Sequence, residues 1–197
     1  MTESERKQII ALVQREVIPA IGCTEPIAVA LCVAKATETL GAKPEKIKVL
    51  LSANILKNAM GVGIPGTGMI GLPIAVALGA LIGKSDYQLE VLKDSSPEAV
   101  EEGKKLIDEK RICISLKENI TEKLYIEVMC EAGGEQATAI ISGGHTTFVY
   151  VAKGDEILLN KQQVYGEEEE EEELELTLQA TDSQRGRGRG FARTKLA

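Results

Sequence analysis

The sequence predicts an α+β protein, in which buried helices are followed by an antiparallel sheet and then by a disordered acidic and basic C-terminal tail. Before Arg111 the apolar residues recur mainly at helical spacing, whereas after it they alternate with polar residues at the period of a β-strand. Helices followed by a run of strands are typical of the α+β class. Beyond Tyr165 the composition changes to polyglutamate and then to SQRGRGRGFARTKLA, which is too polar to bury a core. We therefore expect a folded domain over residues 1–165 and an unfolded tail over 166–197, of the kind that a truncated or frameshifted reading frame would produce.

Two helices are predicted in the first forty residues. Apolar residues at helical spacing predict an amphipathic helix over residues 4–18, which stops near Pro19. The second helix, over residues 27–40, is apolar nearly all round and is therefore expected to be buried. Thr24 is the expected N-cap of this second helix.

The middle of the chain predicts a strand, a glycine-rich loop and two more helices. Residues 47–52 are β-branched and short enough for a strand, and NILKNAM then returns to a helical turn before GVGIPGTGMIGLP. The apolar helix expected over residues 72–82 is too short to cross a bilayer, so it is assigned to the core. A last helix, capped by Ser96 and ending near Lys110, is charged on one face and belongs on the surface.

Four antiparallel strands with one solvated face are predicted after these helices. The alternating segments are RICISLK, KLYIEVMCEA, EQATAIISG and TTFVYVA, and turn residues separate them.

Composition argues against nucleic acid and membrane as partners. The net charge of −7 depends on the glutamate run of residues 167–173 with Glu175, and the body without it is close to neutral. Aromatic residues make up only 3% of the chain, which disfavours recognition of single-stranded nucleic acid by stacking. The RGRGRG segment leaves an RNA-binding tail as a weaker alternative. The N-terminus MTESERKQII carries charges where a secretory signal needs an apolar stretch, so we expect a cytoplasmic protein.

The four cysteines form no CxxC pair, so neither a zinc site nor a self-contained cluster site can be inferred from their spacing. Cys32, Cys113 and Cys130 lie in apolar periodic segments and are expected to be buried and inert. Cys23 differs because it lies in a GCTEP turn at the start of a helix. A helix N-terminus there would stabilise its thiolate, while the alternative is a small buried residue at a helix junction.

Two polar segments are candidate ligand sites. In the PGTGM loop, glycines would let backbone N–H groups approach a carboxylate or phosphate, although a simple tight turn explains the pattern equally well. Asn54, Lys57 and Asn58 lie one helical turn apart and could bind an amino-acid carboxylate, or they could form an ordinary exposed face. His145, the chain's one histidine, lies in SGGHT between two predicted strands and is a further site candidate.

Several of these segments carry a resemblance to a known family. EVIPAIGCTEPIAVAL, LSANILKNAMGVGIPGTGMIGLPIAVALGAL, LEVLKD and ISGGHT, in this order, resemble the N-terminal half of the L-cysteine desulfidase family. That family is related to the α chain of iron–sulfur L-serine dehydratases. The resemblance runs from about Ile9 to Val151.

The resemblance implies a lyase that converts L-cysteine to pyruvate, ammonia and sulfide by β-elimination, with a [4Fe–4S] cluster acting as Lewis acid. It implies that Cys23 is a proton-transfer thiol or a displaceable cluster ligand, and that Glu25 and His145 are catalytic. The residues that it places around the substrate are Asn54, Lys57, Asn58, Gly66, Thr67, Gly68 and Thr146.

Members of the resembled family continue for about as many residues again, and that later half holds the cysteines that ligate the cluster. We therefore expect this chain alone to bind no cluster and to be inactive. Its expected partners are an amino-acid substrate, L-cysteine or L-serine, and the missing C-terminal half. The alternative functions are part of an L-serine dehydratase, or a non-catalytic amino-acid-binding domain.

Overall fold

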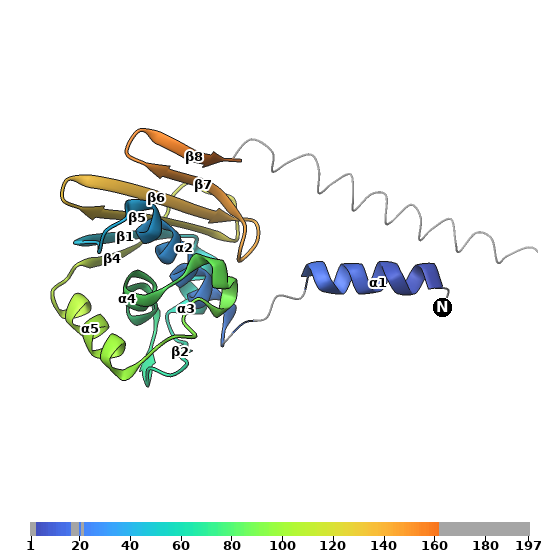
Figure 1. Ribbon diagram of the computed structural model, residues 1–197, viewed down its shortest axis with the longest axis horizontal. Helices are drawn as coiled ribbons and strands as arrows, with labels where there is room; N and C mark the ends of the chain where they lie inside the picture. Colours follow the sequence, from blue (N-terminus) through green and yellow to red (C-terminus); the bar gives the residue numbers. More distant parts are fainter. Residues whose placement is uncertain (1–2, 17–19, 21, 162–197) are drawn as a thin grey trace, which may run out of the picture. The chain divides into compact units, whose positions relative to one another are not determined.

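A computed structural model describes residues 3–16, 20 and 22–161 (Figure 1). The expected tail over residues 166–197 and the expected domain end at residue 165 lie outside these residues. The helices and strands, in chain order, are α1 (Glu3–Glu16), α2 (Thr24–Leu40), β1 (Lys46–Leu51), α3 (Ala53–Ala59), β2 (Gly63–Ile64), β3 (Met69–Ile70), α4 (Leu72–Ile82), the 3-10 helix η1 (Ser85–Glu90), α5 (Pro97–Asp108), β4 (Ile112–Leu116), β5 (Tyr125–Ala132), β6 (Glu135–Ser142), β7 (Phe148–Lys153) and β8 (Glu156–Asn160).

Six of the strands form one sheet, in the order β4-β1-β5-β6-β7-β8. All neighbouring strands are antiparallel except β1 and β4, which pair in parallel with Val49 opposite Ile114. The parallel pair forms because α5 carries the chain back before β4 begins, as a helical crossover does.

Helices α2, α4 and α5 pack on one face of the sheet in successive layers (Figure 1). Helix α2 lies against β5 and β6, α4 packs on α2, and α5 packs on α4. Because α2 is covered by the sheet on one side and by α4 on another, its residues from Ile27 to Ala34 are almost completely buried. This explains why the helix is apolar nearly all round.

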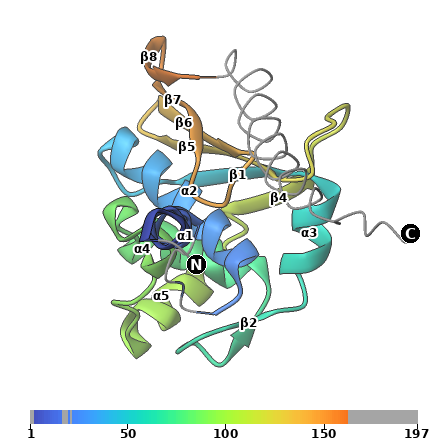
Figure 2. The same ribbon diagram turned by 90° about the vertical axis from the view of Figure 1, so that its right-hand side faces the viewer.

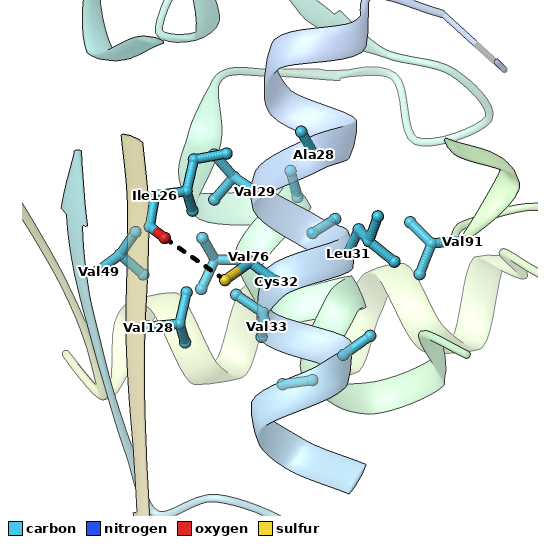
Figure 3. Close-up of a cluster of buried hydrophobic side chains, with 14 of the residues drawn as sticks. Ala28, Val29, Leu31, Cys32, Val33, Val49, Val76, Val91, Ile126 and Val128 are labelled. Atoms are coloured by element: carbon cyan, nitrogen blue, oxygen red, sulfur yellow. Dashed lines mark hydrogen bonds between the residues drawn. The ribbon is translucent and has the colours of Figure 1, made fainter. Parts of the chain in front are cut away.

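The centre of the core shows how α2 is held (Figure 3). Leu31 points toward Val91, which follows η1, while Cys32 points toward β5. The Cys32 thiol lies 3.3 Å from the Ala139 carbonyl oxygen and 3.8 Å from that of Ile126, and it donates a hydrogen bond toward them. Burial raises the pKa of Cys32 well above its ordinary value, so this thiol stays protonated in the core.

Several expectations from the sequence are confirmed. The architecture is α+β, helix α4 has the expected bounds, and Ser96 caps α5 by accepting a hydrogen bond from the Ala99 backbone N–H. Cys32 and Cys130 are buried, as expected. Among the residues that the structure describes, no helix is long and apolar enough to cross a membrane.

Four expectations need correction. The expected four-stranded antiparallel sheet has six strands, because β1 joins it and because β8, an edge strand with exposed Ile157 and Leu158, lacks the alternation that marks the others. Strand β4 is not antiparallel to its neighbour. The glycine-rich loop contains the hairpin β2–β3, and Cys113 is exposed on β4 instead of buried.

Candidate functional site

Helices α2 and α4 run in the same direction, so their N-termini lie at the same end of the helical layers. A Cβ atom added to Gly79 would lie 2.6 Å from the carbonyl oxygen of Ala30, and one added to Gly83 would lie 2.7 Å from the Cβ of Ala34. Residue numbers therefore increase in the same direction along both helices, which are parallel where they touch. The partial positive charges of the two helix N-termini lie on the same side of the fold and favour an anion there.

The N-terminal end of α2 lies at the end of the sheet's strands where β1 and β6 finish and where β5 and β7 begin. Cys32, at the middle of α2, contacts the Ile126 carbonyl near the start of β5, whereas Thr37, further along the helix, contacts Cys130 near the end of β5. Tyr125 pairs with Ser142, so the loop after β6 lies at this edge. The N-terminus of α2 therefore points toward the β6–β7 loop, which carries His145.

Cys23 occupies the N-cap position of α2, and its thiol donates a hydrogen bond to Oε2 of Glu25 over 2.9 Å. The Thr24 hydroxyl donates to the same oxygen over 3.3 Å. The expected capping by Thr24 is wrong, because Thr24 is the first residue of the helix and the N-cap side chain makes no capping hydrogen bond.

The electrostatics of this pair count against one of the two interpretations of Cys23, the stabilised thiolate. The pKa of Cys23 is raised, chiefly by the hydrogen bond to Glu25 and then by burial, so its thiolate is not stabilised. The pKa of Glu25 is lowered, chiefly by the same hydrogen bond. The helix N-terminus does favour an anion, but the Glu25 carboxylate is that anion and Cys23 holds the proton.

His145 lies in a tight loop between β6 and β7. The backbone N–H of Thr147 donates to the Gly144 carbonyl over 3.1 Å, and a Cβ on Gly144 would lie 2.7 Å from the Thr147 hydroxyl oxygen. His145 and Thr146 are half-buried on this loop. The charge of His145 contributes to the lowered pKa of Glu25, so the structure brings His145 near the Cys23–Glu25 pair. No direct hydrogen bond joins them among the contacts of the described residues.

The hairpin β2–β3 lies on the side of α2 and α4 away from the sheet strands β5–β8 (Figures 1 and 2). Gly66 and Gly68 have positive φ angles of 77° and 65°, and a Cβ on either would meet nothing within 4 Å. They are glycines because of the backbone conformation, and open space lies beside them. The Thr67 hydroxyl closes the turn, since it donates to the Ile64 carbonyl over 2.7 Å and accepts from the Met69 N–H.

A contact between Gly22 and Pro65 brings this hairpin next to Cys23. A Cβ on Gly22 would lie 2.7 Å from Cγ of Pro65, so the backbone before Cys23 touches the proline ring. The sequence gives no local signal for this contact, because the two residues are far apart in the chain. Pro65 is the residue of this site that sequence reasoning missed.

The polar residues of α3 are not drawn into this group. Asn54, Lys57 and Asn58 are exposed on α3, which follows the end of β1. Asn54 lines a surface hollow of about 510 Å³ with residues 116–123, and Lys57 and Asn58 do not line it. A hydrogen bond joins Cys23 to Glu25, the charge of His145 acts on Glu25, and Gly22 before Cys23 contacts the glycine hairpin. Among the described residues, no hydrogen bond or ion pair joins the three α3 residues to this group.

The cysteines of the described chain do not fit a complete ligand set for an iron–sulfur cluster. Cys32 and Cys130 are enclosed in the core, and Cys113 is exposed on β4 beside Lys48 and Met129. In the part of the chain that the structure describes, no three His, Cys, Asp or Glu side chains are placed to hold one metal ion. Cys23 is the one cysteine of the four that lies at the site.

The chain is similar in sequence to several UPF0597 proteins, whose names state no activity. It is 96% identical to one from Bacteroides fragilis over 169 residues, which are 86% of this chain and 40% of that protein. It is 78% identical to one from Bacteroides thetaiotaomicron over 169 residues, 86% of this chain and 39% of that protein. It is 41% identical to one from Aeromonas hydrophila over 157 residues, 80% of this chain and 35% of that protein. The matched part of the chain thus spans about 35–40% of the length of these three relatives. No family model matches the chain.

Proposed function

We propose that the site around Cys23, Glu25 and His145 belongs to a lyase that acts on a small α-amino acid, with L-cysteine as the substrate and L-serine as its nearest rival. The observation that carries the proposal is the hydrogen bond of the Cys23 thiol to the Glu25 carboxylate, with His145 and the glycine hairpin beside it. Three of the motifs that resemble the L-cysteine desulfidase family, GCTEP, PGTGM and GGHT, supply these residues, whereas the α3 residues of the same resemblance do not take part.

The Cys23–Glu25 pair suits a reaction that moves protons. β-Elimination breaks the Cα–H and Cβ–S bonds of L-cysteine and releases sulfide with aminoacrylate, whose imine tautomer takes up water to give pyruvate and ammonia. A base must accept the α-proton and an acid must supply one to the leaving sulfur. Glu25 is the ionised member of the pair and Cys23 the protonated member, so together they can hold and return one proton at this position.

In the resembled family, a bound [4Fe–4S] cluster supplies a Lewis acid for the leaving sulfur. Of the described cysteines, Cys23 would be the one to approach such a group, and the remaining ligands would have to come from outside the described residues. The proposed partners are therefore an amino-acid substrate and a cluster-bearing part of the full-length protein. Nucleic acid and membrane are not among the proposed partners.

We also place this activity in the cytoplasm. All four cysteines are free, and a reducing compartment would keep Cys23 in the thiol form that the site uses.

Two alternative functions would give different results in the experiment described below. An L-serine dehydratase would use the same residues with a hydroxyl as the leaving group. A non-catalytic amino-acid-binding domain would use the open space beside Gly66 and Gly68 without needing the Cys23–Glu25 proton.

The test uses the UPF0597 protein of Bacteroides fragilis, which is 96% identical to this chain over the matched region. The full-length protein is reconstituted anaerobically with iron and sulfide, and release of sulfide and pyruvate is measured with L-cysteine and with L-serine. We expect turnover of L-cysteine that falls by at least about 100-fold when the residue matching Glu25 becomes Gln. The matched control changes to Gln the residue that matches Glu98, an exposed glutamate at the start of α5.

Pyruvate from L-serine in preference to L-cysteine would favour the dehydratase alternative. Calorimetric binding of L-cysteine with no turnover would favour the binding domain. The proposal would be refuted if the protein neither bound nor turned over either amino acid.

A further inference from the structure

We infer that Gly22 and Pro65 are positioning residues, whose contact sets the place of Cys23 relative to Glu25 at the N-terminus of α2. This inference rests on the proposed function only where it assigns proton transfer to Cys23. The contact itself can be tested without measuring turnover.

The contact leaves no room for a side chain at residue 22. A Cβ on Gly22 would lie 2.7 Å from Cγ and 3.0 Å from Cδ of Pro65. Gly22 also has a φ of 92°, a region that residues with a Cβ rarely adopt. Any larger residue would therefore have to move either the hairpin or the backbone that leads into Cys23.

The hairpin that carries Pro65 is held in place by a buried side chain and by its own hydrogen bonds. Ile64, next to Pro65, is buried, and its carbonyl accepts hydrogen bonds from the Thr67 backbone and hydroxyl. The Gly71 N–H donates to the Val62 carbonyl over 2.8 Å, which closes the base of the hairpin. The pyrrolidine ring of Pro65 adds a fixed backbone angle.

The base of the hairpin also packs closely against the end of α3. A Cβ on Gly71 would lie 2.8 Å from the Met60 carbonyl oxygen, so the chain passes close to the end of α3. Pro65 therefore acts as a fixed surface against which the GCTEP turn rests.

A shift of Gly22, the other residue of the contact, would move Cys23 directly. Cys23 follows Gly22, has the extended backbone of an N-cap residue, and donates to Glu25 over 2.9 Å. A hydrogen bond weakens steeply with a change in length or angle, so a small shift of residue 22 would weaken this one. The Gly22–Pro65 contact thus influences proton transfer at the site by setting the position of the Cys23 thiol.

The experiment measures the alkylation rate of Cys23 by iodoacetamide against pH, in the 197-residue chain with Cys113→Ser. Cys113 is exposed and would otherwise react, whereas Cys32 and Cys130 are buried. Four proteins are compared: the parent, Gly22→Ala, Pro65→Ala and the double variant.

We expect Gly22→Ala to shift the alkylation profile to lower pH and to raise the rate near pH 8 by about threefold to tenfold, since one pKa unit corresponds to about tenfold in thiolate. Pro65→Ala should shift the profile less, because it removes the surface without pushing the turn. The double variant should return toward the parent, because the new methyl group fills the space that the proline ring leaves. This non-additivity is the signature of a direct contact.

The matched control is Gly41→Ala at the C-terminal end of α2, which introduces a Cβ at a φ of 76° with nothing within 4 Å. It carries the backbone strain of Gly22→Ala without the collision, and it should leave the Cys23 profile unchanged. Protection of Cys32 and Cys130 from labelling reports that each variant is folded.

A Gly22→Ala profile equal to that of the parent, or a double variant equal to Gly22→Ala, would overturn the inference. If Gly22→Ala does not fold, Pro65→Ala decides alone, and an unchanged profile would overturn the inference. Lyase activity plays no part in these outcomes, so failure of the proposed function would be seen separately.

Discussion

The thiol of Cys23 lies 2.9 Å from Oε2 of Glu25 and donates a hydrogen bond to it. The pKa of Cys23 is raised above its ordinary value of 9.0, first by this bond and then by burial. Glu25→Gln removes the charged acceptor, so we predict a lower pKa for Cys23 and an alkylation profile shifted to lower pH. The rate at pH 8 should rise by about threefold to tenfold in the Cys113→Ser background.

The control for this prediction is Glu98→Gln, which changes an exposed first-turn glutamate on another helix. It should leave the profile of Cys23 in place. A profile that moves to higher pH in Glu25→Gln would mean that Glu25 does not hold the Cys23 proton.

A second prediction concerns the count of reactive thiols. Cys113 is exposed and Cys23 is half-buried, whereas Cys32 and Cys130 are enclosed by the core. Burial raises the pKa of Cys130 to about 11. We therefore expect two thiols to react with Ellman's reagent in the native chain at pH 8 and all four in denaturant. Rapid reaction of a third thiol in the folded chain would contradict the buried placement of Cys32 or Cys130.

The lowered pKa of Glu25 makes a third prediction about acid stability. The folded value lies below the ordinary 4.5, so Glu25 contributes stability above pH 4.5 and loses it as pH falls through the lower folded value. The difference in free energy of unfolding between the parent and Glu25→Gln should therefore shrink as the pH is lowered below 4.5. Urea unfolding at a series of pH values measures this, and a difference that grows on acidification would contradict it.

The elements that the sequence predicted well are those whose signal is local. Helix α4 has the expected bounds because Gly71 and Gly83 flank an uninterrupted apolar run, and Ser96 caps α5 because it precedes Pro97 and Glu98. Alternation identifies β4 as a strand but says nothing of its partner, so its parallel pairing with β1 had to come from the structure.

The same distinction holds at the site. Cys23 and Glu25 are two residues apart, so their contact follows from the start of one helix. The approach of His145 to Glu25, and of Pro65 to Gly22, depends on how the layers pack, and no local pattern encodes either. Of the two interpretations of Cys23 left open by the sequence, the stabilised thiolate considered the helix N-terminus without the neighbouring carboxylate, which raises the pKa of the thiol.

A fourth prediction concerns cluster uptake. Cys32 and Cys130 are in the core and Cys113 is exposed on β4, so they do not converge with Cys23. We expect the 197-residue chain, treated anaerobically with iron and sulfide, to retain far less than one [4Fe–4S] cluster per chain. Iron and acid-labile sulfide are measured after gel filtration. Stoichiometric uptake that disappears in Cys23→Ala would show that this chain can hold a cluster, and it would contradict the prediction.

The last prediction addresses the packing that aligns the N-termini of α2 and α4. A Cβ on Gly79 would lie 2.6 Å from the Ala30 carbonyl oxygen, and this neighbour is backbone that cannot rotate away. Overpacking of a core costs about 1–3 kcal/mol, and the gain of about 1 kcal/mol from replacing a helical glycine offsets only part of it. We expect Gly79→Ala to lower the midpoint of urea unfolding without changing its slope. Gly63→Ala is the control, because a Cβ there meets nothing within 4 Å, and it should change the midpoint little. A Gly79→Ala variant more stable than the parent would show that the helices have room to separate, and the shared end of α2 and α4 would then be less firmly fixed than the contact implies.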